Sequence, residues 1–309
     1  MSGSPIVILG VFVADTAYRA TRQPRIGETV LGTAFKLGPG GKGSNQAVAA
    51  GRLGGNVSFI TRLGRDAFAE MAVTTWTEAG VKPVVIETPE SYTGAAYIFV
   101  EEESGDNAII VSPGAAMLIS AADIEANAEL IRSAGIFVTQ LEQPIDAARR
   151  GLAIARGADV TTILNPAPGT TLPDDIFPQC HYLTPNEMEA EALTGIAVDS
   201  IDSARRAADT LLGKGAGAVI VTLGEKGALF HTASQSEHVP AFVVGPVVET
   251  TGAGDAFNGG FAFALARGLT GIEAVRFACA VAGISVTRHG TAPSMPSLTE
   301  VEQVLSRFE

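Results

Sequence analysis

The chain has 309 residues, of which 46% are hydrophobic and 17% are charged, and its formal net charge is −12. This length is sufficient for one α/β domain with a large core and room for a small appendage, and the composition indicates a compact globular enzyme rather than a disordered chain. The acidic balance, without any basic block, argues against nucleic acid or an anionic membrane as a partner. The two cysteines, Cys180 and Cys279, have no C-x-x-C spacing, so neither a disulfide framework nor a zinc site is indicated.

Short apolar runs alternate with helical patterns along the chain. We expect strands at residues 6–9, 57–61, 135–140, 161–165, 181–184 and 218–223, and helices at residues 121–134, 146–156, 186–194 and 203–213. Such alternation predicts a mostly parallel, Rossmann-like sheet with helices on both faces. The N-terminus leads directly into the first apolar run, and no apolar run is long enough to span a membrane, so we expect a cytoplasmic protein.

Two segments, residues 13–36 and 92–111, show the period-two alternation of half-buried strands instead. An acidic turn at residues 101–106 marks a hairpin in the second segment. We interpret both segments as a small β lid on one domain that spans residues 1–309. The lid is expected to lie over the carboxyl ends of the main strands, where ligands of α/β proteins usually bind.

A glycine-rich segment, GPGGKGSN at residues 38–45, precedes a run of small helical residues. Its glycines expose backbone that a Cβ would shield, while Lys42 and Asn45 supply donors for hydroxyls or phosphates. The segment is not a Walker A loop, because Gly43 follows Lys42 where Ser or Thr is required. It also lacks the G-x-G-x-x-G pattern of a dinucleotide site.

A second glycine-rich turn, ETTGAGDAFNGG at residues 249–260, leads into an apolar helix. The first N–H groups of a helix are unpaired and its dipole is positive there, so this turn suits an anion. Asp255 in the turn is placed to act as a base beside a bound phosphate, or alternatively it is only a favourable charge at a helix start. Two such helix starts far apart in the chain predict two ends of a ligand meeting in one cleft.

The segments GGKGSNQAVAAGRLG and ETTGAGDAFNGGF resemble the two signatures of the ribokinase-like (PfkB) family of carbohydrate kinases. Further matches follow in the family's order over essentially the whole chain, at residues 10–15, 27–29, 140–142, 164–168, 184–189, 222–227 and 286–290. The resemblance implies a three-layer Rossmann-like fold with a β lid, and a homodimer paired through that lid. It also implies an ATP-dependent kinase that converts D-ribose to D-ribose 5-phosphate at the primary 5-hydroxyl.

The resemblance assigns roles to both turns. Asp255 accepts the proton of the sugar hydroxyl, and the amides of Gly252, Ala253 and Gly254 stabilise the transferred phosphoryl group. The sugar-binding positions are Val13, Asp15, Gly41, Lys42, Gly43, Asn45, Glu142 and Asp255. Carboxylates and amides suit vicinal hydroxyls, each of which needs a partner once desolvated. The alternatives are a solvated strand end for Glu142 and a turn residue for Asp15.

The nucleotide and ion positions also follow from the resemblance. The positions that contact ATP are Asn186, Thr222, Gly224, Gly227, Gly254 and Cys279. Asn186 and Glu189 share one face of a helix start, and Glu189 is expected to hold Mg²⁺ through water, because Mg²⁺ keeps several waters. A monovalent cation, with K⁺ the expected activator, is assigned to Glu249, Thr251, Ser285, Arg288, Gly290 and Ser294, mainly through backbone oxygens. The family usually has Asp at position 249, so the carboxylate of Glu249 has a longer reach.

Val13 bears on which sugar is bound. Ribose-specific members of the family usually have Asn two residues before the sugar-binding Asp, whereas deoxyribose-specific members have an apolar residue. An apolar side chain at this position leaves a desolvated sugar hydroxyl without a hydrogen-bond partner. It has no such energetic cost for a sugar that lacks the hydroxyl. D-Ribose is the first expectation and 2-deoxy-D-ribose the second, and the alternative for Val13 is simple packing of the strand.

Other classes of function are less consistent with the sequence. Another sugar or nucleoside kinase of this fold would keep Asp255, but the small lid residues Ala95 and Ala96, together with Ile110, favour a pentose over a nucleoside. A sugar-binding protein without activity would be expected to lack the base or the anion site. An NAD-dependent oxidoreductase would be expected to have the missing glycine fingerprint.

Overall fold

The computed structural model describes residues 3–308. Over these residues the larger sheet has nine strands in the order β13-β12-β11-β10-β9-β8-β1-β4-β5. The strands are β1 (Ile6–Leu9), β4 (Val57–Leu63), β5 (Lys82–Glu87), β8 (Ile136–Thr139), β9 (Thr161–Leu164), β10 (Tyr182–Leu183), β11 (Ala218–Thr222), β12 (Ala228–His231) and β13 (Ser236–Val239). Pairings from β11 to β5 are parallel, and β12 and β13 add antiparallel strands at one edge.

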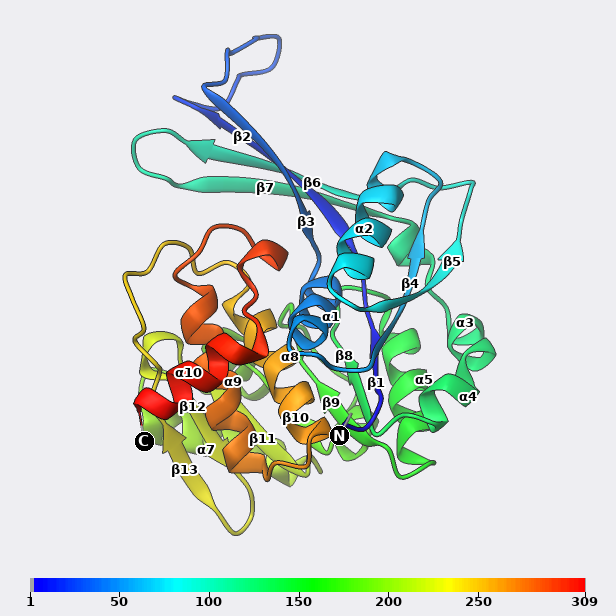
Figure 1. The fold of residues 1–309 in the computed structure, drawn as a ribbon, viewed down its shortest axis with the longest axis vertical. Coiled ribbons are helices and arrows are strands. Elements are labelled where there is room, and N and C mark those ends of the chain that lie inside the picture. Colours follow the sequence, from blue (N-terminus) through cyan, green and yellow to red (C-terminus); the bar gives the residue numbers. More distant parts are fainter. Residues whose placement is uncertain (1–2, 309) are drawn as a thin grey trace.

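Helices cover both faces of this sheet, as Figure 1 shows. Alternate side chains of each strand point to opposite faces, so Ile6 and Ile8 belong to one apolar core and Val7 and Leu9 to the other. The first core is closed by α1 (Lys42–Arg52), α2 (Ala67–Glu78), α8 (Ala253–Ala266), α9 (Gly271–Ser285) and α10 (Leu298–Arg307). The second is closed by α3 (Ala121–Ala126), α4 (Ala128–Arg132), α5 (Ile145–Arg156), α6 (Glu187–Thr194) and α7 (Ile201–Gly213). The predicted three-layer fold is confirmed.

The structure differs from the expected elements in places. The helix predicted at residues 121–134 is broken into α3 and α4 at Asn127, whose side-chain amide donates to the carbonyl of Asp123 at 2.9 Å. Such a local bond competes with the helical backbone pattern. The strand predicted at residues 181–184 is reduced to the two residues of β10. The edge strands β5 and β13, the neighbouring strand β12 and the helices α2, α9 and α10 were not predicted.

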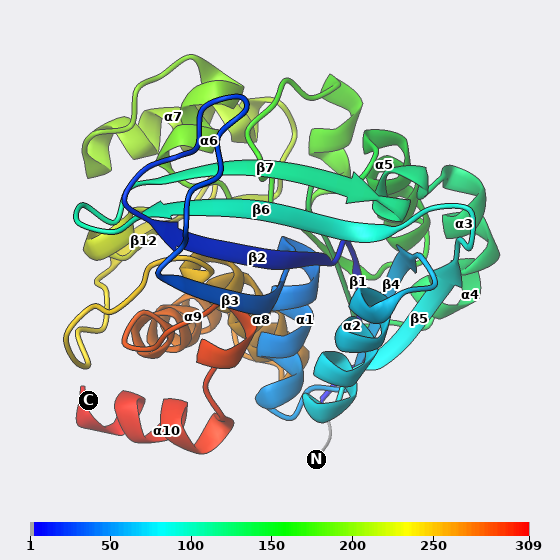
Figure 2. The same ribbon diagram turned by 90° about the horizontal axis from the view of Figure 1, so that it is seen from above.

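A second, smaller sheet has the strand order β3-β2-β6-β7 over the described residues. Its strands are β2 (Val13–Ala20), β3 (Ala34–Gly40), β6 (Thr93–Glu101) and β7 (Asn107–Gly114). They come from the two segments with period-two patterns, but β3 and β7 continue beyond the predicted limits at residues 36 and 111. This lid sheet projects from the body in Figure 1 and crosses above α1 and α8 in Figure 2.

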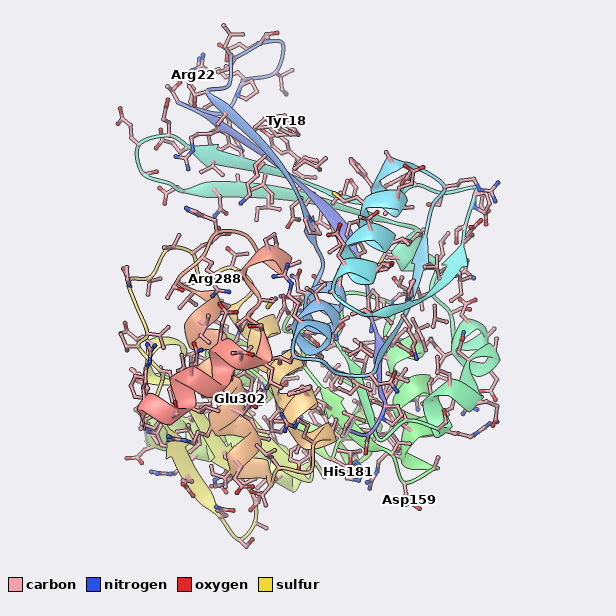
Figure 3. The ribbon with its side chains drawn as sticks, in the orientation of Figure 1. Tyr18, Arg22, Asp159, His181, Arg288 and Glu302 are labelled. Carbon is pink, nitrogen blue, oxygen red and sulfur yellow. The ribbon has the colours of Figure 1, made fainter. Side chains whose placement is uncertain are left out.

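The two faces of the lid sheet differ in character. Tyr18 pairs with Phe35 across β2 and β3, and its ring lies 5.0 Å from the ring of Phe35 and 5.6 Å from that of Tyr97. Tyr18 and Arg22 lie on the projecting part of the lid, away from the body (Figure 3). Strand alternation puts Asp15 on the face opposite to Tyr18. The aromatic face is therefore turned away from the side chain expected to bind sugar.

Within residues 3–308, none of the helices combines the length and apolar character needed to cross a bilayer.

Candidate active site

A small cavity lies at the carboxyl edge of the parallel strands, between the starts of α1, α6 and α8. Loops that follow β9, β10 and β11 bring polar side chains to this edge, as expected for an open α/β sheet. The lining residues are Lys42, Asn165, Ala167, Thr184, Asn186, Glu189, Thr222, Gly252, Gly254, Asp255 and Asn258. A wider groove lies between α2 and β5, but its polar groups are already used: Arg65 pairs with Glu87, and Asp66 caps α2. The cavity is therefore the better candidate.

The start of α1 exposes backbone because Gly41 and Gly43, on either side of Lys42, have no side chain. Gly41 is the N-cap with φ 90°, and a Cβ there would lie 2.6 Å from the carbonyl oxygen of Val11. Gly41 has no side chain to cap the helix, and the amide of Lys42 donates instead to Oε2 of Glu142 at 2.8 Å. Gly43 packs closely against Gly10: a Cβ on Gly43 would lie 2.7 Å from the Cα of Gly10. The predicted sugar-binding residues of this turn therefore lie beside Glu142.

The start of α8 is a second helix end without a side-chain cap. Gly252 takes a left-handed conformation with φ 84°, which glycine adopts without strain, and both Gly252 and Gly254 line the cavity. The amide of Ala253, one of three expected to face a phosphoryl group, instead donates to the carbonyl of Thr250 at 3.1 Å. That amide thus takes part in the turn, and its expected contact with a phosphoryl group stays a prediction.

Asp255 is the centre of the cavity and is almost entirely buried. Its Oδ2 accepts a hydrogen bond from Nδ2 of Asn45 at 2.9 Å, and its Oδ1 accepts one from Nε2 of Gln46 at 3.2 Å. Burial raises the pKa of this carboxyl, although the Lys42 ammonium and the two amide donors oppose the rise. A buried carboxylate with a raised pKa is a better proton acceptor than an exposed one.

Several carboxylates surround one lysine in this site. Burial disfavours the Lys42 ammonium, but Asp255, Glu142 and Glu189 outweigh it and raise the pKa of Lys42. Burial raises the pKa of Glu142 to about 7 despite the nearby Lys42. Burial, together with the charge of Glu249, raises the pKa of Asp15 to about 6. These carboxyls carry more negative charge than Lys42 alone balances.

The side chains of β2 divide between the two cores. Val13 is buried with Ala96 and Leu141, whereas Ala14 belongs to the opposite core, so Val13 shares the face of Asp15. The carboxylate of Asp15 lies over Gly40, where a Cβ would come within 2.3 Å of Oδ2. Glycine at this position of β3 therefore leaves room for Asp15.

The predicted nucleotide residues are divided between the cavity and its surroundings. Asn186 and Glu189 form a reciprocal cap on α6: the amide of Glu189 donates to Oδ1 of Asn186 at 2.8 Å, and the amide of Asn186 donates to Oε2 of Glu189 at 2.9 Å. Both line the cavity with Thr222. Gly227 has φ 98°, and a Cβ there would lie 2.1 Å from the carbonyl oxygen of Val239, so this glycine is required by the turn itself.

Other residues of this group lie outside the cavity lining. Gly224 has φ 54° at the start of the turn after β11. Cys279 is buried on α9 within the apolar core. Lys226, which lies between the two glycines of that turn and has no predicted role, is exposed, and its ammonium donates to the carbonyl of Asp199 at 3.2 Å.

The residues expected to hold Mg²⁺ offer a single carboxylate. Within residues 3–308, no group of three or more His, Cys, Asp or Glu is arranged to hold a metal. Glu189 lines the cavity and is buried, with its pKa raised by that burial. One of its oxygens caps α6, which leaves the other to face the cavity. This donor set fits an ion that keeps its waters better than one held directly by protein ligands.

The predicted cation residues gather in two neighbouring turns. Oε2 of Glu249 accepts from the amide of Gly290 at 2.9 Å, and the hydroxyl of Ser294 donates to the carbonyl of Thr291 at 2.7 Å. The hydroxyl of Ser285 donates to Ala282, and Arg288 pairs with Glu300, so both side chains are directed elsewhere. Arg288 lies on the body below the lid in Figure 3, and Thr251 is exposed in the turn before α8. Backbone oxygens and the carboxylate of Glu249 are the groups best suited to an ion here.

Four polar residues of the site had no role in the sequence analysis: Gln46, Asn165, Thr184 and Asn258. Asn165 and Thr184 each follow a buried parallel strand, and that position alone marks them as residues of the ligand edge. Asn258 lies one turn after Gly254, and its Nδ2 donates to the carbonyl of Gly254 at 2.8 Å. Nothing in the local sequence distinguishes Gln46 from an ordinary helical residue.

Comparison with known proteins agrees with the fold. Residues 6–298 match the pfkB family of carbohydrate kinases. The chain is 38% identical to a deoxyribokinase of Salmonella typhi over 98% of this chain and 99% of that protein. It is 37% identical to a ribokinase of Staphylococcus aureus over 97% and 99% of the two chains. The structure of Arabidopsis thaliana ribokinase in complex with ribose and ATP superposes with a TM-score of 0.93, at 31% identity over 99% of both chains. The chain therefore belongs to the pfkB family of carbohydrate kinases.

The raised pKa of Glu142 predicts that Glu142→Gln stabilises the protein at pH 8 by on the order of 1–3 kcal/mol, because one pKa unit corresponds to about 1.4 kcal/mol. At pH 8 the folded state holds an ionised, buried carboxylate that the unfolded chain leaves in water. As the pH falls below about 7, the folded state takes up a proton before the unfolded state does, so the penalty disappears. The gain should shrink towards pH 5.

Urea unfolding of both proteins at pH 8 and pH 5 measures this gain. Glu90→Gln, the same change at an exposed residue, is the control and should alter stability at neither pH. An equal gain at both pH values, or an equal gain from Glu90→Gln, would contradict the prediction.

Proposed function

We propose that this protein is an ATP-dependent kinase that phosphorylates the primary 5-hydroxyl of D-ribose, with 2-deoxy-D-ribose as the second candidate substrate. The observation that carries the proposal is the buried Asp255, held by Asn45 and Gln46 at the uncapped start of α8. The ribokinases and the deoxyribokinase to which the chain is similar support this class of reaction.

In the proposed reaction Asp255 accepts the proton of the sugar hydroxyl as that oxygen attacks the γ-phosphoryl group. The helix start around Gly252 and Gly254 and the ammonium of Lys42 stabilise the charge on the phosphoryl oxygens. Asp15, Asn45 and Glu142 accept or donate hydrogen bonds to the remaining hydroxyls. Gly41 and Gly43 allow the sugar to approach the backbone.

The nucleotide is proposed to lie along Asn186, Thr222, Gly224 and Gly227. Gly254 would contact its γ-phosphate, and Cys279 would be a further contact of the nucleotide. Glu189 would hold Mg²⁺ through water, and the ion would neutralise phosphate charge. Because ATP is the proposed phosphoryl donor, we propose a cytoplasmic location.

The identity of the sugar depends on different observations from the type of reaction. Identity to the deoxyribokinase is 38% and to the ribokinase 37%, so the comparisons do not separate the two substrates. Val13 occupies the face of Asp15 and supplies no hydrogen bond. We retain D-ribose first because ribokinases recur among the similar proteins and structures.

We also propose a homodimer formed through the lid. Its face opposite to Asp15 carries the exposed side chains of Tyr18, Phe35, Leu37 and Ile110. A contiguous apolar patch on a lid sheet is unusual on a protein that stays monomeric, and the edge of such a sheet favours pairing.

The deciding experiment is an ATP-dependent phosphorylation assay with D-ribose, 2-deoxy-D-ribose, fructose and adenosine. The proposal requires the highest kcat/KM for one of the two pentoses. A preference for fructose or adenosine would assign the protein another role in the family, and binding of ribose without turnover would indicate a protein that has lost the activity.

Asp255→Asn should lower kcat by about 100-fold or more, because general base catalysis contributes roughly that factor. Affinity for ribose and ATP, measured by calorimetry, should stay within a few-fold of wild type, because the amide keeps the shape of the side chain. Near wild-type turnover by a folded variant would remove Asp255 from the role of base.

Val13→Asn should favour ribose over 2-deoxyribose. One regained hydrogen bond to a neutral hydroxyl contributes about 0.5–1.5 kcal/mol, or roughly a threefold to tenfold change in the ratio of kcat/KM values. Val13→Ala, which removes apolar volume without adding a donor, is the control. An unchanged ratio in a folded Val13→Asn enzyme would show that this position does not sense the 2-hydroxyl.

Turnover should rise several-fold in K⁺ relative to Na⁺ or choline if Glu249 and the carbonyls around Gly290 hold a monovalent cation. The ion would order the turns that end in Gly252 and Gly290. Glu249→Asp, which restores the usual family residue, should keep or increase the dependence on K⁺. Equal rates in all three salts would indicate that the Glu249 bond to Gly290 orders the turn without an ion.

A further inference from the structure

We propose that Gln46 is a positioning residue that fixes the direction of the Asp255 carboxylate, and so determines which oxygen faces the sugar hydroxyl. This inference rests on the function proposed above, in which Asp255 is the base. Gln46 lies one residue after the sugar-binding Asn45 on α1, is fully buried, and is not among the residues that line the cavity. It therefore reaches the site through the residues that it bonds, and one of these is Asp255.

The orientation of the Gln46 side chain is set by its other partners. Its Oε1 accepts from Nε2 of Gln140 at 2.6 Å. Its Nε2 donates to Oδ1 of Asn165 at 3.1 Å and to Oδ1 of Asp255 at 3.2 Å. An amide nitrogen has two N–H groups, so one is available for each acceptor. With its oxygen held by Gln140, Gln46 presents a donor to Asp255.

The same chain of hydrogen bonds returns to the backbone beside Asp255. Nδ2 of Asn165 donates to the carbonyl of Thr184 at 3.0 Å, and the hydroxyl of Thr184 donates to Oδ1 of Asn258 at 2.6 Å. Nδ2 of Asn258 then donates to the carbonyl of Gly254 at 2.8 Å. The backbone before Asp255 and the carboxylate of Asp255 are thus tied to one buried polar network.

Gln46 and Asn45 hold different oxygens of Asp255 and serve different purposes. Oδ1 of Asn45 is buried and accepts no hydrogen bond from any residue between 3 and 308, so Asn45 has an acceptor left for a ligand hydroxyl. Without Gln46, one donor would hold the carboxylate, and rotation about the Cβ–Cγ bond of Asp has only a broad preference. Two donors on two oxygens leave a single orientation.

The charged groups that face Asp255 do not depend on Gln46. They are Lys42 on α1, Glu142 after β8 and Glu189 at the start of α6. The bond from Gln46 stabilises the ionised form of Asp255, so its loss raises the pKa of Asp255 further. The base must be ionised to accept a proton. As the pH is lowered, the variant should therefore lose turnover at a higher pH than wild type does.

The test compares Gln46→Met with Ser44→Ala. Methionine keeps the length of the side chain but has no N–H group. Ser44 lies on the same helix and is equally buried, and its hydroxyl accepts from Nε1 of Trp76 at 2.8 Å rather than bonding Asp255 or its partners. We expect Gln46→Met to lower kcat about tenfold and to shift the acidic limb of its pH profile upward by about one unit, with little change in either KM. Ser44→Ala should lose stability without shifting that limb.

Gln46→Glu keeps the polarity of the side chain and serves if Gln46→Met does not fold. Its ionised form opposes the charge of Asp255, so it should shift the acidic limb at least as far. The titration of Asp255 is measured without turnover from the carboxyl bands in infrared difference spectra against Asp255→Asn. If wild type phosphorylates none of the sugars, the proposed function fails, and the infrared titration still tests Gln46. An unshifted limb and an unshifted Asp255 titration in a folded Gln46 variant, or an equal shift in Ser44→Ala, would overturn the proposal.

Discussion

The hydrogen bonds from α1 to Asp255 are the constraint on which the rest of the site depends. They join residues 210 positions apart in the chain, at the starts of two helices. The bonds require α1 and α8 to pack very closely, and Gly259 permits this: a Cβ there would lie 2.5 Å from the carbonyl oxygen of Gln46 and 2.6 Å from the Cβ of Ala49. A larger residue would separate the helices and break both bonds. The small residues of the two signatures therefore serve packing and chemistry together.

The lid is attached to the same pair of helices. β3 ends at Gly40 and leads through Gly41 directly into α1, so any movement of this lid strand reaches the start of the helix. The hydroxyl of Thr291 donates to the carbonyl of Pro39 at 2.8 Å, and its side chain packs against Gly252 at the start of α8. One lid strand is thus linked to both helix starts, directly to α1 and through Thr291 to α8. A movement of the lid can therefore shift the start of α1, on the sugar side of the cavity, and the start of α8, on the anion side, together. This link does not require a bound ligand.

The sequence predicted the parallel sheet and its ligand edge because buried strands are short apolar runs and both helix starts are marked by glycines. It did not predict β5, which contains Pro83, or β13, which is mostly polar, because edge strands lack that apolar pattern. It missed Gln46 because its partners Gln140 and Asn165 are distant in the chain. Nor did it predict the bond from the Ala253 amide to the carbonyl of Thr250 in the turn before α8. Side-chain networks and turn closures depend on contacts that no local pattern records.

The buried carboxylates of the site lower the stability of the fold but suit the binding of a sugar. One lysine, Lys42, faces Asp255, Glu142 and Glu189 in a chain whose net charge is −12. Burial raises the pKa of each of these carboxyls. Near neutral pH, their ionised forms therefore lower the stability of the folded protein, because they have lost water that protein groups do not fully replace. Hydroxyl donors from a bound sugar are what such carboxylates lack, because each donor replaces a lost water. Substituting Glu142 by its amide would therefore relieve the fold and weaken the same contacts that a sugar would complete, so the site keeps carboxylates at the expense of stability.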